Sequence, residues 1–145
     1  MITRNSTLVA SLKNALTSAL GMLCVGAVWA EDLAGEDQFL CAASEVIVCV
    51  DDGTCASAVP WELNIPQFIN VDLKKRSLTT TEASGDLRMT KVDNMKRDED
   101  RIYLQGIEGG RAYTFVIDVE TGFLTVVVAR DFLTVSVFGA CTPSA

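Results

Sequence analysis

Carboxylates and cysteines are the side chains of this sequence whose chemistry could serve a reaction. The chain has 19 Asp and Glu, five Cys and no His. Without His, the Ser-His-Asp and Cys-His nucleophilic systems lack their general base, and histidine zinc sites lack their ligands. A Ser-Lys pair or two carboxylates converging at about 5 to 10 Å remain as routes to hydrolysis. We expect no enzyme and no cofactor, and keep a carboxylate-dependent hydrolase as an alternative.

The acidic clusters are explained more simply as turns and solvated loops than as sites. Asp51-Asp52 precedes Gly53, and Asp favours turns because its side chain hydrogen-bonds the local backbone. The Asp98–Asp100 cluster lies between two arginines and lacks the alternating acidic spacing of a dedicated calcium loop. Asp118 interrupts an apolar run before Glu120-Thr121-Gly122, where capping the turn is its simplest role. We therefore predict no metal site.

The first 30 residues have the pattern of a secretory signal peptide. Arg4 and Lys13 are the only charges before Glu31, an apolar run fills residues 16–28, and small residues precede Glu31. A retained anchor would need about 20 apolar residues, more than this run offers. We expect cleavage after Ala30 and a periplasmic or secreted protein with no membrane association in its mature form.

Residues 31–145 should form one acidic domain. Loss of residues 1–30 removes two basic side chains and no acid, so the formal charge falls from −7 to −9. This balance argues against nucleic acid, whose phosphates need a basic surface, and suits a basic partner. Within this part we expect a flexible polar segment over 31–40 and a single β domain over 41–145. We also expect the protein to be a monomer.

Four cysteines remain after cleavage and predict two disulfides in an oxidising compartment. Four cysteines allow three pairings. The turn sequence Asp51-Asp52-Gly53-Thr54 favours joining Cys49 to Cys55, which leaves Cys41 for Cys141. The second bridge would close a loop of roughly a hundred residues, worth about 4 to 5 kcal/mol on the chain-entropy model.

The closing stretch, residues 111–141, dominates the fold prediction. Three runs rich in Val, Ile, Thr and Phe are separated by breaks too short for a helix, which indicates sequential antiparallel strands. Similar runs upstream bring the total to about eight strands. Short connections favour a small antiparallel, mostly up-and-down barrel, with a two-sheet sandwich as the alternative. We expect Leu87, Met89 and Ile107 to face the core, with Arg88 and Thr90 outward and a slip of phase before Val92.

Trp61 is the best candidate for a binding contact. It lies in a segment flanked by Pro60 and Pro66, which disfavour a central strand. With Glu62 and Asn64 it could present a rigid aromatic contact at the barrel mouth. The structural alternative is that Trp61 plugs one end of the barrel.

The mature chain resembles small exported proteins of Gram-negative bacteria for which no activity is known. The resemblance rests on segments spread over residues 41–143. In architecture the chain is also distantly similar to periplasmic lysozyme inhibitors, which are small disulfide-bearing β-barrels, although their Ser-Gly-x-x-Tyr loop is missing. The segments that carry the first resemblance are Cys41, Cys49 and Cys55, Pro66–Asp72, Leu104–Gly106, Val119–Gly122 and Phe138–Pro143.

These observations favour a non-enzymatic periplasmic or secreted binding domain whose partner is a protein or a small envelope-associated molecule. An inhibitor of a basic cell-wall hydrolase is one version of this hypothesis. A lipocalin-like carrier of an apolar small molecule is the main alternative, since barrels of this size can hold one ligand. A filled, cavity-free interior would exclude the carrier.

Overall fold

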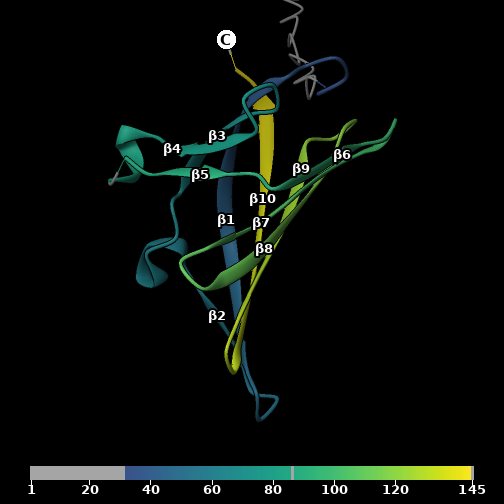
Figure 1. Cartoon of the computed structure of the whole chain (residues 1–145). Coiled ribbons are helices and arrows are strands. Elements are labelled where there is room, and N and C mark those ends of the chain that lie inside the picture. Colours follow the sequence, from purple (N-terminus) through teal and green to yellow (C-terminus); the bar gives the residue numbers. More distant parts are fainter. Residues whose placement is uncertain (1–31, 86, 145) are drawn as a thin grey trace, which may run out of the picture.

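A computed structural model describes residues 32–85 and 87–144, which form one antiparallel sheet of ten strands (Figure 1). The predicted signal peptide lies outside the described residues. The strands are β1 (Gln38–Val50), β2 (Cys55–Ala58), β3 (Phe68–Asp72), β4 (Ser77–Thr80), β5 (Met89–Lys91), β6 (Asn94–Arg97), β7 (Arg101–Glu108), β8 (Arg111–Asp118), β9 (Phe123–Arg130) and β10 (Leu133–Pro143). Two short 3₁₀ helices, η1 (Pro60–Leu63) and η2 (Glu82–Ser84), interrupt them. The all-β prediction is confirmed.

The sheet curls into a half-barrel with up-and-down topology. Its strand order is β5-β4-β3-β1-β10-β9-β8-β7-β6, and β2 pairs with β1 beside this path. Apart from the β1–β10 and β1–β3 pairs, each strand on the path pairs with its neighbour in sequence. The predicted up-and-down topology is therefore confirmed. The strands β5 and β6, which are consecutive in the chain, do not pair with each other and form the two edges of the sheet. Short strands β2 and β6 raise the number above the eight expected.

β1 and β10 run side by side for the length of the molecule (Figure 1). Their register begins at Phe39 with Pro143 and ends at Val50 with Leu133, with a shift between Ala43 and Glu45. The shift marks a bulge, which bends a strand. On its other edge β1 pairs with β3 over residues 38–42 and with β2 over residues 46–49. The segment between β2 and β3, which includes η1, lies outside the sheet. One wall of the half-barrel is therefore a loop and not a strand.

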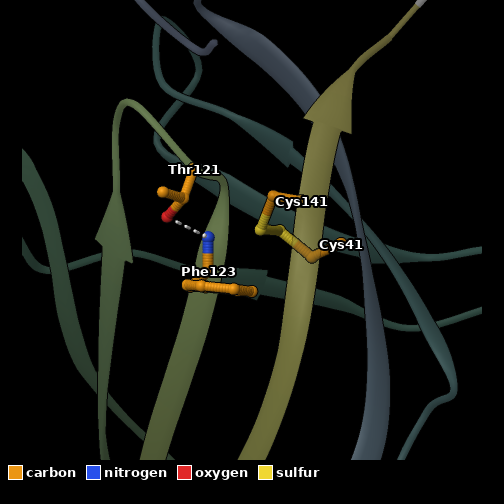
Figure 2. The surroundings of a disulfide bond; sticks show 4 residues. All are labelled: Cys41, Thr121, Phe123 and Cys141. Carbon is orange, nitrogen blue, oxygen red and sulfur yellow. Dashed lines mark hydrogen bonds between the residues drawn. A yellow bond between two sulfur atoms is a disulfide. The ribbon is translucent and has the colours of Figure 1, made fainter. Parts of the chain in front are cut away.

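Both predicted disulfides are present. Cys41 and Cys141 are opposite residues of β1 and β10, and Figure 2 shows their bridge near Thr121 of the β8–β9 turn and Phe123, the first residue of β9. Cys49 and Cys55 are opposite residues of the β1–β2 hairpin. One bridge therefore ties the two ends of the described chain together, while the other closes a local turn.

Part of the segment expected to be flexible, residues 31–40, packs against the core of the described structure. Leu33 is fully buried, and its N–H donates a 2.8 Å hydrogen bond to the Val119 carbonyl. The Arg97 guanidinium donates to the carbonyls of Leu33 and Glu36 at 2.6 and 2.7 Å. Phe39, already in β1, is also fully buried. Leu33 and Phe39 lie among polar residues, so the sequence pattern did not indicate that both side chains belong to the core.

The phase predicted for β5 is wrong. Leu87 and Met89 are each 71% exposed, whereas Arg88 and Thr90 are half-buried and face the interior. The physical reason is register, because Thr90 pairs with the buried Leu78 and must share its face. Val92 is buried in the same phase as Thr90, so the alternation continues without the predicted slip.

Ile107 also faces outward, 72% exposed, and not toward the core as predicted. The inward phase of β7 is that of Ile102, Leu104 and Gly106, all buried.

The core fills the end of the half-barrel where Phe39, Leu33, Ile102, Leu104 and Ile117 are buried.

Among the described residues, none of the helices has the length and the apolar character that crossing a bilayer requires.

Candidate ligand pocket

The concave side of the half-barrel contains a pocket of about 260 Å³, here called the inner pocket. It is open to solvent, because Leu63 and Asn64 at the end of η1 and Arg130 at the end of β9 are exposed and belong to its lining. Its wall comes from β1, β3, β4, β5, β7, β8, β9 and β10, and the η1 segment covers one side. The apolar lining includes Ala43, Val48, Leu63, Ile65, Ile69, Leu78, Phe115, Leu124, Val126, Val128, Leu133, Val135 and Val137.

Strand alternation explains why this wall is apolar. On β9 the inward residues are Leu124, Val126 and Val128, while Val127 between them is 42% exposed. The same period of two places Val135 and Val137 of β10 inside. Val128 and Val135 are register partners, so the two strands give a continuous aliphatic surface.

On each strand the residues that face the pocket form a row, here called the inward row. Charged residues stand at the end of these rows where the pocket opens. Arg111 begins the inward row of β8, and Arg130 ends that of β9. Glu108, at the end of β7, lies 4.0 Å from Arg88 across the open edge, measured from its carboxylate oxygen to Nε. We call these four residues, Arg88, Glu108, Arg111 and Arg130, the mouth. The pocket is therefore apolar within and ionic at its opening.

Side-chain bonds hold together the open edge of the half-barrel. The Tyr113 hydroxyl donates a 2.7 Å hydrogen bond to the Lys91 carbonyl, and the Ile107 N–H donates to the Asp93 carboxylate at 3.1 Å. Burial raises the pKa of Tyr113 to about 12, and the charges of Asp93 and Glu108 add to this effect. The phenol therefore keeps its proton, and its donor role, throughout the physiological pH range.

The size of the inner pocket indicates a ligand of modest size. An engineered apolar cavity of about 150 Å³ stays dry and binds benzene, whereas pockets for drug-sized ligands begin near about 300 Å³. At about 260 Å³ the inner pocket lies between these values.

Trp61 does not plug the barrel, because its side chain is 67% exposed on η1. It lines a second, smaller pocket of about 160 Å³ next to η2. Asn64 ends η1 in the left-handed conformation, with φ of 53°, and lines both pockets. Glu62 is exposed and its carboxylate accepts a 3.5 Å hydrogen bond from the Val59 N–H. Its role in binding, like that of Trp61, stays a prediction.

Carboxylates do not converge in the inner pocket, whose described lining includes one acid, Glu108. Asp118 caps the β8–β9 turn, as expected. Its carboxylate accepts hydrogen bonds from the N–H and hydroxyl of Thr121, both at 2.8 Å. These bonds, with the nearby Arg101, lower the pKa of Asp118.

The fold and pocket define a class of structure, an antiparallel half-barrel with an open apolar interior. Comparison with models of known protein families and with curated proteins finds no match to this chain. We therefore base the functional proposal on the geometry of the pocket.

Proposed function

We propose that this protein is a non-enzymatic binding protein of the periplasm or the secreted fraction, and that it holds a small apolar molecule in the inner pocket. The observation that carries the proposal is the open, aliphatic cavity of about 260 Å³ within the half-barrel. The two disulfides fit an oxidising compartment. The carrier alternative is thus better supported than the hydrolase, which needs paired acids.

Energetics set a lower limit on the ligand. Burying one CH₂ group contributes about 0.8 kcal/mol, and association costs at least about 4 kcal/mol in lost freedom of motion. About five buried CH₂ groups would only offset that cost. A chain of about ten carbons is therefore a reasonable probe, since longer ligands would outgrow the cavity.

Adjacent residues of β9 supply a matched test. Val128→Trp would fill the inner pocket, whereas Val127→Trp places the same side chain on the outer face. Isothermal titration calorimetry with decan-1-ol should show binding to the wild type and to Val127→Trp, and little or none to Val128→Trp. Circular dichroism checks that both variants fold. Absence of decanol binding to the wild type, or equal binding to both variants, contradicts the proposal.

A second candidate is a protein inhibitor that uses the η1 segment. Its support is the exposure of Trp61, because a large aromatic residue held on a short helix suits the centre of a protein interface. The purified protein should then suppress a basic cell-wall hydrolase, and Trp61→Ala should relieve the suppression. No effect on a panel of lysozymes would exclude this inhibitor.

A further inference from the structure

We propose that the ligand is an anionic amphiphile, whose head group binds Arg111 and Arg130 while its apolar tail enters the inner pocket. This inference rests on the proposed function and adds the chemical class of the ligand. It follows from the position of the two arginines, from their lack of ion-pair partners, and from the contrast between the mouth and the rest of the surface.

Hairpin register places the two arginines side by side. Ala112 of β8 pairs with Ala129 of β9, so Arg111 and Arg130 occupy the next opposed positions on these neighbouring strands. Both line the inner pocket and therefore share a face of the sheet. Like charges directly opposite each other destabilise a strand pair. An anion bound between them would remove that repulsion.

No ion pair of the described residues satisfies either arginine. Arg88, Arg97 and Arg101 contact Glu108, Asp37 and Asp118, respectively. Glu108 is the register partner of Arg111, yet its carboxylate pairs with Arg88 on β5's side of the open edge. Asp131 follows Arg130 in the chain but forms no ion pair with it in the described structure.

The net charge of the mouth is opposite in sign to the net charge of the whole protein. Its three arginines and one glutamate carry a formal charge of +2, whereas the full chain carries −7. An acidic surface repels anions in general, so a positive mouth offers an anionic ligand one favourable place to bind. A guanidinium also matches carboxylate and phosphate groups in geometry, because it can donate two parallel hydrogen bonds.

Alternation along the strands orients the ligand. Moving inward by two residues leads from Arg130 to Val128 and then Val126, and from Arg111 to Tyr113 and then Phe115. The head-group contacts thus lie at the start of the aliphatic wall. A tail attached to an anion at the mouth would run along the inward faces of β8 and β9.

A series of ten-carbon probes tests the head group. Decanoate and decyl phosphate should bind at least about tenfold more tightly than decan-1-ol, because a charge-assisted hydrogen bond contributes more than about 1.4 kcal/mol. Decyltrimethylammonium should bind more weakly than the alcohol. The preference for anions should shrink as salt is raised from 20 to about 500 mM, since screening weakens exposed charge interactions. Relative affinities of decanoate and decyl phosphate identify the preferred anion.

Variants locate the charge effect. Arg111→Gln and Arg130→Gln should each weaken decanoate binding by about tenfold and leave decanol binding within about twofold. Arg76→Gln is the control, because it removes the same charge from the exposed β3–β4 turn, away from the pocket. It should leave both affinities unchanged.

The outcomes separate this inference from the proposed function. If decanol binds in the inner pocket but decanoate binds no more tightly, the head-group inference fails and the binding protein remains. An equal loss of decanoate affinity in Arg76→Gln would also overturn it, because the effect would then reflect overall charge. If no probe binds the wild type, both fail.

Discussion

The phenol of Tyr113 donates a 2.7 Å hydrogen bond to the main-chain carbonyl of Lys91 and joins β8 to β5, two strands that share no ladder. The bond crosses over Gly106, the register partner of Tyr113 on β7. A Cβ atom at position 106 would overlap the phenol, so only glycine lets the ring lie across β7. The Tyr113–Lys91 bond therefore partly closes the half-barrel at the gap between β5 and β6, where no strand ladder forms.

Tyr113→Phe should lower the free energy of unfolding by about 1 kcal/mol, because it leaves the Lys91 carbonyl without this donor. Urea denaturation followed by circular dichroism measures the loss. Tyr103→Phe is the matched control, since no hydrogen bond of the described structure involves the Tyr103 hydroxyl, and it should be nearly neutral. Equal effects of the two variants would mean that the Lys91 bond contributes nothing to stability.

Gly106→Ala should destabilise the protein by about 1 to 3 kcal/mol, because the added methyl group displaces the Tyr113 ring. The cost should fall well below this when position 113 is already alanine. A double-mutant cycle with Tyr113→Ala, measured by urea denaturation, gives the coupling between the two positions. Additive effects would show that the strain at Gly106 lies elsewhere.

The two disulfides should differ in their contribution to stability. Cys41 and Cys141 are 100 residues apart, whereas Cys49 and Cys55 are separated by 6. On the chain-entropy model, the Cys41→Ala/Cys141→Ala variant should lose about 4 to 5 kcal/mol and the Cys49→Ala/Cys55→Ala variant about 2. Guanidinium denaturation of the two double variants compares them. A larger loss from the short loop would contradict the model for this protein.

Acid should remove the stabilisation that Asp118 provides. Hydrogen bonds from Thr121 and the charge of Arg101 lower the folded-state pKa of Asp118. A lowered pKa gives stability that is present above the unfolded pKa of about 3.9 and disappears as pH falls through the folded value. Asp118→Asn should therefore be less stable than the wild type at pH 7, and the difference should narrow below about pH 4.

Thermal unfolding at pH 7 and at pH 3 tests this expectation. Asp131→Asn is the control, because Asp131 is exposed and has no ion pair in the described structure. A difference between wild type and Asp118→Asn that stays constant with pH would show that the carboxylate charge is unimportant at this turn.

Local sequence predicted the features that depend on neighbouring residues. The Asp-Asp-Gly-Thr turn indicated the Cys49–Cys55 bridge, and the breaks at Glu120-Thr121-Gly122 and Arg130-Asp131 indicated the closing hairpins. The phase of β5 was predicted wrongly, because the alternation of Leu87-Arg88-Met89-Thr90 favours Leu87 and Met89 inward, whereas both are exposed in the structure. Pairing with Leu78, a tertiary contact, decided it.

The mouth was missed because its members lie far apart in the sequence. Arg111 and Arg130 are separated by 18 residues and become neighbours only through the β8–β9 register. A signal was available, since the two residues are equidistant from the centre of the Glu120-Thr121 turn. Continuing the strand pairing outward from that turn would have placed Arg111 opposite Arg130. Arg88 gave no such signal, because its inward direction depends on the phase of β5.

The β1–β10 register has a practical consequence for handling the protein. Phe39 and Pro143 are partners at one end of this pair, whereas Val50 and Leu133 are partners at the end where Leu133 lines the pocket. The described chain therefore ends at the Pro143 end of β10, whereas Arg130 of the mouth pairs with Leu133 at the opposite end of that strand. An affinity tag, a fluorophore or a surface linker attached at the C-terminal end should leave ligand entry unobstructed, which suits the protein to immobilised binding assays.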